Sequence, residues 1–169
     1  ALIKSFLKAG VMTTIGTREG TITGTPQGGI LSPLLANIAL SVLDEYFMQQ
    51  WHSLMCNEVQ RQKRRRHHLA NYRLVRYADD FLVLVTGEAE DVQEIREAVV
   101  DVLAPMGLRL SPDKTRVGHI DEGIDFLGFN IRRMRKWGSH KSFVYTRPCK
   151  AAIASIKGRV RTMTYNNTL

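Results

Sequence analysis

Two adjacent carboxylates, Asp79 and Asp80, are the residues of this sequence best suited to chemistry. They lie between two short runs of strand-forming residues, 71–77 and 81–86, which predicts a β-hairpin with the acids at its tip. Paired negative charges there are costly unless a cation lies beside them. Mg²⁺ binds through one or two carboxylates and completes its shell with phosphate oxygens. Two such ions, about 3.5–4 Å apart, would activate a 3′-hydroxyl and stabilise a leaving pyrophosphate. A simple Asp-Asp turn is the alternative.

The charge of the chain favours a polyanionic partner. The 169 residues include 24 Lys and Arg against 16 Asp and Glu, a net charge of +8. The excess is concentrated in two stretches without any acid, 60–78 with seven Lys or Arg and 126–169 with ten. Such stretches predict binding to nucleic acid, and a solvated basic surface is the alternative. No apolar run approaches the roughly 18 residues of a membrane span, so no membrane partner is expected.

The helix that precedes the hairpin is the most strongly predicted element. Ser32 and Pro33 are typical of a helix start, and apolar periodicity extends the helix to about Trp51. We expect the amide of Asn37 to hydrogen-bond to backbone within the helix packing. The side chains assigned to the core are Leu34, Leu35 and Ile38.

The remaining periodicity predicts an α+β fold, an antiparallel sheet with helices packed on one face. The two cysteines, Cys56 and Cys149, have no disulfide or zinc spacing, so a reducing cytoplasm is expected. The other expected elements are a helix ending at Gly10, a hairpin over 12–24, a loop or insertion over 52–70, a helix over 92–102, strands over 115–120, 126–133 and 142–146, and a basic helix over 151–163.

Four blocks of sequence, in the same order, resemble the bacterial reverse transcriptases. Tyr77-Ala78-Asp79-Asp80 is similar to their YxDD box, and Gly24–Ile38 resembles their TPQGG-x-x-SPLLANI block. Leu110–Thr115 and Phe126–Phe129 match the next two blocks. The motifs TPQGG, YADD and FLGF are most similar to those of the reverse transcriptase/maturases encoded in group II introns.

This resemblance implies the palm of a right-hand polymerase and DNA synthesis on an RNA template. It implies two Mg²⁺ ions, for which Mn²⁺ could substitute, held by Asp79 and Asp80. The implied partners are dNTP, the RNA template, the RNA–DNA duplex and group II intron RNA, in a bacterial cytoplasm. In family terms, residues 1–146 correspond to the palm, without the fingers and first catalytic strand, and 147–169 to the beginning of a helical thumb.

Further site residues follow from the matched blocks. Glycines before a helix N-terminus allow a ligand to approach the backbone, and the helix end favours an anion. Lys114, after a Ser-Pro turn, could reach a triphosphate, or it is simply a solvated charge. The nucleotide and template residues that the resemblance implies are Pro26, Gln27, Gly28, Gly29, Tyr77, Ala78 and Lys114, and the implied primer grip includes Leu127 and Gly128.

Basic residues in both acid-free stretches are candidates for nucleic-acid backbone contacts. Those in the segment before the hairpin match no family block, and a solvated loop is the alternative. The thumb-like residues would lie along the primer–template duplex. The candidates are Arg64, Arg65, Arg66, Lys150, Lys157 and Arg159.

The resemblance also implies that part of the active site lies outside this sequence. The family takes a further metal-binding Asp from a strand that would lie upstream of Ala1, so this chain alone is expected to be inactive. The surface left by that strand is expected to promote self-association.

Two other functions stay open. An RNA-binding maturase without polymerase activity would need the basic surfaces, but not two uncompensated acids at a hairpin tip. A reverse transcriptase from a retron, a diversity-generating element or a CRISPR-linked system would share the YADD box.

Overall fold

The computed structural model describes residues 4–5, 11–12, 18–19 and 32–165. The chain forms two compact units, Ala1–Arg109 and Leu110–Leu169. The predicted end of the first helix at Gly10 and the block 24–31 lie outside the described residues.

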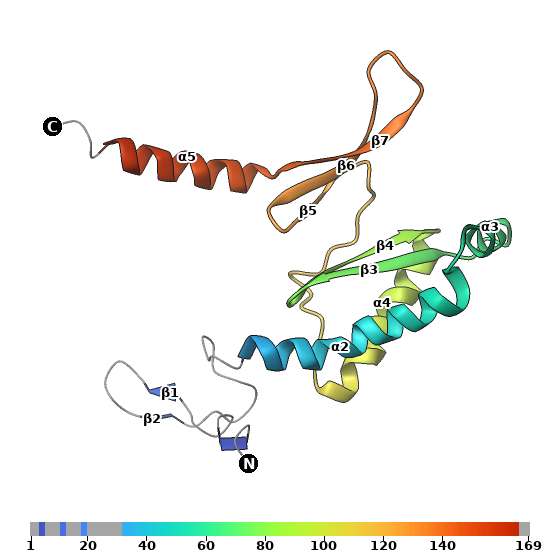
Figure 1. Ribbon diagram of the computed structural model, residues 1–169, viewed down its shortest axis with the longest axis horizontal. Coiled ribbons are helices and arrows are strands. Elements are labelled where there is room, and N and C mark those ends of the chain that lie inside the picture. The colour runs from blue at the N-terminus through green and yellow to red at the C-terminus, as the bar shows by residue number, and fades with distance from the viewer. Residues whose placement is uncertain (1–3, 6–10, 13–17, 20–31, 166–169) are drawn as a thin grey trace. The chain divides into compact units, whose positions relative to one another are not determined.

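The first unit combines helices with an antiparallel hairpin (Figure 1). Its longest strands, β3 (Asn71–Tyr77) and β4 (Asp80–Thr86), pair antiparallel over their full length. α2 (Ser32–Gln50) packs against β3 and against α4 (Ala89–Leu103). A short antiparallel pair, β1 (Val11–Met12) with β2 (Arg18–Glu19), overlaps the hairpin predicted over 12–24 and begins one residue before it. Between α2 and β3 lie a π-helical turn, Trp51–Met55, and α3 (Glu58–Arg66).

Apolar side chains of α2 and α4 form the core of this unit. Leu43 and Phe47 of α2 are buried, as are Val99 and Leu103 of α4. These positions recur at helical spacing on one face of each helix, as an amphipathic helix requires. The ring of Phe47 meets that of Tyr72 on β3 edge-on, with centroids 5.8 Å apart, so the same core supports the hairpin.

The ends of α4 follow ordinary capping chemistry. Glu88 and Asp91 form a reciprocal capping box at its N-terminus. A 3₁₀ turn, Ala104–Met106, continues α4 and ends at Gly107, whose φ of 69° is left-handed. The helix predicted over 92–102 is confirmed.

Three expectations for the first unit are wrong. The segment 52–70 is largely helical rather than a loop, because Asn57 caps α3 by accepting a hydrogen bond from the Gln60 amide. Leu34 and Ile38 are 57% and 59% exposed rather than in the core. Asn37 is also exposed, and its side chain bonds to another side chain instead of backbone.

The second unit is a three-stranded antiparallel sheet followed by a helix. β6 (Phe129–Arg135) lies between β5 (Ile124–Phe126) and β7 (Ser142–Pro148). α5 (Lys150–Tyr165) has no buried residue. The predicted strand over 115–120 is wrong. Gly123, with φ of 92°, turns the chain into β5, and only one backbone bond, from the Arg133 amide to the Ile120 carbonyl, joins the earlier segment to β6.

The α+β class with antiparallel strands is confirmed, although the described strands form three separate sheets. Among the residues described, no helix combines the length and the apolar character needed to cross a bilayer.

Candidate active site

The tip of the β3–β4 hairpin is a two-residue turn. Tyr77 pairs with Asp80, so Ala78 and Asp79 form the turn, and β4 begins one residue earlier than predicted. Ala78 has a φ of 55°, in the left-handed region that favours glycine. A residue other than glycine holds this conformation only where its surroundings enforce it, and such residues cluster at functional sites. The hairpin itself is confirmed.

Both carboxylates at this tip are open to solvent. Asp79 and Asp80 are exposed, and neither takes part in the ion pairs or side-chain hydrogen bonds formed among residues 32–165. Tyr77, beside them, is 68% exposed. Within the same described residues, no group of three or more His, Cys, Asp or Glu side chains is close enough to hold a metal ion. The tip therefore presents two free carboxylates that need ligands from elsewhere to complete a metal shell.

Arg76 connects this turn to α2. Its Nη1 donates to the carbonyl oxygen of Ala78 at 2.6 Å and to Oδ1 of Asn37 at 2.8 Å. Its Nε donates to both carboxylate oxygens of Asp44, at 3.1 and 3.0 Å, and its Nη2 also donates to Asp44. The guanidinium fork suits such two-point recognition of a carboxylate. The turn that displays the two acids is thus held by a charged bridge to the preceding helix.

The bridge is partly buried. The Arg76 side chain is 13% exposed, and its hydrogen bonds to Asp44 raise the Arg76 pKa above its ordinary value. Asn37 and Asp44 lie seven positions apart, which places them on one face of α2. This bridge was not predicted from the sequence. The available signal was Arg76 itself, a cation in a half-buried strand, which requires a carboxylate partner.

The FLGF block forms a second hairpin tip, in the other unit. Phe126 pairs with Phe129, and the two residues between them, Leu127 and Gly128, have φ values of 50° and 81°. Positive φ at both central residues is typical of a type I′ turn. A Cβ added at Gly128 would meet nothing within 4 Å, so the backbone there is open to a ligand. Lys114 is exposed at the end of a turn closed by a bond from its amide to the Ser111 carbonyl.

The basic residues predicted to contact nucleic acid differ in their surroundings. Arg64 has a structural role, since its Nε and Nη2 donate to the Ala70 carbonyl at 3.1 and 2.6 Å. Arg65 forms an ion pair with Glu58 at 2.6 Å, whereas Arg66 is exposed. The three thumb-like cations, Lys150, Lys157 and Arg159, are exposed on α5. Pro26, Gln27, Gly28 and Gly29 lie outside the described residues.

Trp51 fixes α3 beside β3 in a way the sequence did not predict. The Arg73 guanidinium lies 4.6 Å from the centroid of the Trp51 ring, and that of Arg61 lies 5.3 Å from it. Both distances suit cation–π attraction. Arg61 also donates to the Met55 carbonyl and to Glu58. Part of the basic stretch thus builds the fold instead of facing a ligand.

We expect the stability of α3 to fall at acid pH because Glu58 becomes protonated. Hydrogen bonds from Arg65 and Arg61 hold the Glu58 pKa below its ordinary value of 4.5. Because the folded-state pKa is lowered, this contribution to stability is present above 4.5 and is lost as the pH falls through the lowered pKa. The protection factors of the α3 amides, which correct for the intrinsic pH dependence of exchange, should therefore fall over that range. A Glu58→Gln variant should lack this fall, and an identical pH dependence of the protection factors in both proteins would contradict the prediction.

Comparison with known proteins decides the family. The profile of the family described as reverse transcriptase (RNA-dependent DNA polymerase) matches residues 2–131. The chain belongs to the reverse transcriptase family. This reverse transcriptase chain is 34% identical to Protein YkfC of Escherichia coli (strain K12), over 89% of the chain and 43% of YkfC. It is 33% identical to Group II intron-encoded protein LtrA of Lactococcus lactis subsp. cremoris, over 83% of the chain and 30% of LtrA.

A third relative is an intron maturase from a plant. Nuclear intron maturase 1, mitochondrial, of Arabidopsis thaliana is 28% identical over 62% of the reverse transcriptase chain and 18% of the maturase. The resemblance to the group II intron reverse transcriptase/maturases is therefore confirmed. The chain spans 43% of YkfC and 30% of LtrA, less than half the length of either relative.

Proposed function

We propose that this chain is the palm part, with the beginning of the thumb, of a group II intron-type reverse transcriptase that polymerises DNA on an RNA template. The observation that best supports the proposal is the braced hairpin tip, where Asp79 and Asp80 are both exposed and unpaired among the described residues. Uncompensated adjacent acids held in a strained turn favour a bound cation over a purely structural turn.

Asp79 and Asp80 are suited to hold Mg²⁺, with Mn²⁺ as a substitute. Their oxygens are hard donors open on the solvent side, and the shell would be completed by ligands from outside the described residues and by phosphate oxygens. Two bound ions would supply the charge stabilisation that phosphoryl transfer needs. Arg76 positions the turn, and the small side chain of Ala78 leaves room for a primer terminus beside Tyr77.

The proposed partners are dNTP, the RNA template with its RNA–DNA duplex, and group II intron RNA. The support comes from the exposed cations on α5 and from Arg66, together with the names of the relatives. The open backbone at Gly128 suits contact with a primer strand, and the ammonium group of Lys114 suits contact with phosphates.

Primer extension by the whole protein tests this proposal. With an RNA template, a DNA primer, dNTPs and Mg²⁺, we expect products that reach the template end and that disappear when the metal is chelated. Binding of RNA without any extension, in Mg²⁺ and in Mn²⁺, would contradict the polymerase function. That result would favour the maturase alternative, which the name of the Arabidopsis relative also supports.

A further inference from the structure

The β6–β7 hairpin ends in a turn that exposes a tryptophan almost completely. Trp137 is 99% exposed. The turn is closed by a bond from the Ser139 amide to the Lys136 carbonyl, and Gly138 has a φ of 72°. This arrangement is typical of a type II turn with Trp137 at its first corner. A large aromatic side chain in water on an ordered turn calls for an explanation, because tryptophan is usually well buried.

Several hydrogen bonds brace the turn. Arg135 donates from Nε to the Ser139 carbonyl at 2.8 Å, and its Nη2 lies 2.6 Å from Nδ1 of His140. The Lys136 amide donates to the Lys141 carbonyl at 2.9 Å, and the Lys141 amide donates to Oγ of Ser139. These bonds hold the backbone beneath the indole, so a partner would not have to order the turn on binding.

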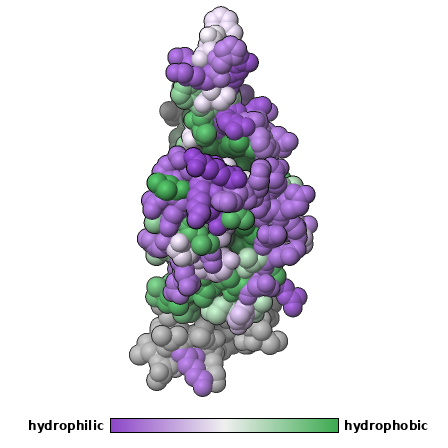
Figure 2. Space-filling view, turned by 90° about the vertical axis from the view of Figure 1, so that its right-hand side faces the viewer, coloured by the Kyte–Doolittle hydropathy of each residue, from purple (hydrophilic) through white to green (hydrophobic). Residues whose placement is uncertain are grey.

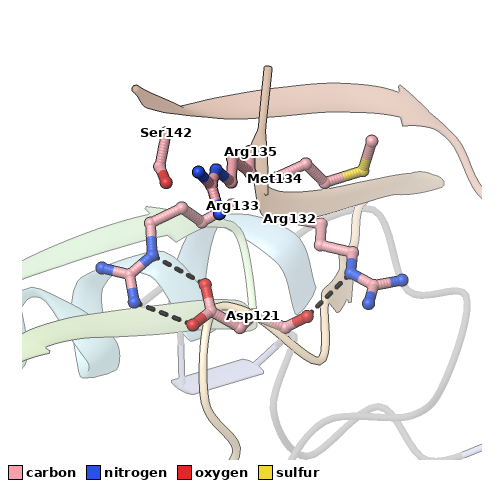
Figure 3. A pocket seen from close by; sticks show the side chains of 6 residues that line it. All are labelled: Asp121, Arg132, Arg133, Met134, Arg135 and Ser142. Carbon is pink, nitrogen blue, oxygen red and sulfur yellow. Dashed lines mark hydrogen bonds and ion pairs between the residues drawn. The ribbon is translucent and has the colours of Figure 1, made fainter. Parts of the chain in front are cut away.

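The strand that leads into the turn is anchored as well. Arg133 forms a two-point ion pair with Asp121, with bonds of 2.7 and 2.8 Å, and Arg132 donates to the Asp121 backbone carbonyl at 2.7 Å (Figure 3). The same contact with Arg133 lowers the Asp121 pKa. Asp121 thus neutralises charge on β6, while no acid follows Asp125 in the sequence.

The surroundings of the indole are cationic. Lys136 and Lys141 flank the turn, both are exposed, and neither belongs to an ion pair among residues 32–165. Figure 2 shows hydrophilic residues gathered around the end of this hairpin, in the uppermost part of the view. An exposed aromatic ring between unpaired cations matches the chemistry of single-stranded nucleic acid, whose bases stack while its phosphates take the positive charges.

We propose that the turn Lys136–Lys141 is a contact site for unpaired RNA, with Trp137 stacking on a base and the two lysines contacting the flanking phosphates. The site lies beyond the residues 2–131 that match the family profile. It deepens the proposed function and rests on it only for the choice of RNA as the partner. Bases in a duplex are already stacked, so the indole should favour single strands.

The test compares Trp137→Leu and Trp137→Phe in the 169-residue chain. Binding to a fluorescein-labelled single-stranded oligoribonucleotide, and to a duplex of the same length, is followed by anisotropy. We expect Trp137→Leu to weaken single-strand binding about tenfold and duplex binding far less. The single-strand affinity of Trp137→Phe should be close to that of the parent, because phenylalanine retains an aromatic ring. Indole fluorescence gives a second measure, since the RNA-dependent quenching should vanish in Trp137→Phe, which leaves only the half-buried Trp51.

Other outcomes overturn the inference. Equal single-strand affinity for parent and Trp137→Leu, with matching circular dichroism, would show that the indole serves another contact. Equal losses on single strand and duplex would show a general electrostatic site without stacking. Failure here leaves the polymerase proposal intact if primer extension by the whole protein succeeds. Failed extension alongside RNA-dependent quenching of Trp137 would refute the polymerase proposal and keep this site.

Discussion

Replacement of Asp79 by Asn is expected to reduce primer extension by the whole protein about 1,000-fold, which corresponds to roughly 4 kcal/mol of lost charge stabilisation. Asn has nearly the same shape as Asp but lacks the negative charge that holds a divalent ion. Asp79 lies in the turn itself, exposed and without an ion-pair partner among the described residues, so the substitution leaves every described ion pair in place. Folding should therefore be retained while activity is lost.

Asp101→Asn provides the matched control for this experiment. Asp101 is exposed on α4 and belongs to none of the ion pairs described for residues 32–165. The control should leave extension and the melting temperature unchanged. Mn²⁺ binding can be followed in the 169-residue chain as paramagnetic broadening of the amides of Ala78, Asp79 and Asp80. Asp79→Asn should weaken this broadening, and full activity in that variant would show that the hairpin tip is not the catalytic site.

Replacement of Arg76 by Gln should affect both stability and activity. It removes the bonds to Asp44, Asn37 and the Ala78 carbonyl, leaving the half-buried Asp44 carboxylate without its cation. Hydrogen bonds to charged groups each contribute about 1.5–3 kcal/mol, so we expect the free energy of unfolding to fall by about 2 kcal/mol. The turn would lose its support, and we expect kcat for extension to fall about 10- to 100-fold.

A positioning role for Arg76 can be separated from a purely structural one. Kinetics should be measured well below the melting temperature of the variant, where both proteins are folded. Positioning predicts a lower kcat and weaker Mn²⁺ broadening at Asp79, with KM for the template–primer unchanged. Arg96→Gln is the control, because Arg96 is exposed on α4 and belongs to no described ion pair. A destabilised Arg76→Gln protein with unchanged kcat would contradict positioning.

The elements around the hairpin were predictable because their signals are local. The strand, turn and strand over 71–86 follow from alternating strand-forming residues and a short polar interruption, and α2 follows from its Ser-Pro start and apolar period. The left-handed conformation of Ala78 was not predictable, because it depends on a bond from Arg76 across the turn rather than on the propensity of alanine.

The errors arose where side-chain and backbone contacts, rather than the apolar period, decide the structure. The basic segment 52–70 shows no clear apolar period, yet it contains α3 because Arg64 reaches Ala70 and because Arg61 and Arg73 lie over Trp51. The segment 115–120 has strand-like composition but does not pair, because Gly123 redirects the chain into β5, which pairs with β6. Propensity is a weak predictor wherever tertiary contacts compete with it.

The sequence by itself determined the family, the α+β class, the hairpin that presents Asp79 and Asp80, and the basic character of the surfaces. These properties depend on ordered motifs, short-range periodicity and residue charge, all of which can be read from the sequence without knowledge of tertiary contacts. Only the tertiary structure decided which cations are free. In the structure, Arg64 and Arg76 form contacts that stabilise the fold, and Arg65 forms an ion pair with Glu58. Lys136 and Lys141 are exposed beside the exposed Trp137 and belong to no described ion pair. The physical reason is that an arginine or lysine can bind a ligand only when no carboxylate or carbonyl of the protein already holds it. Most of those partners are brought close to the cation by folding.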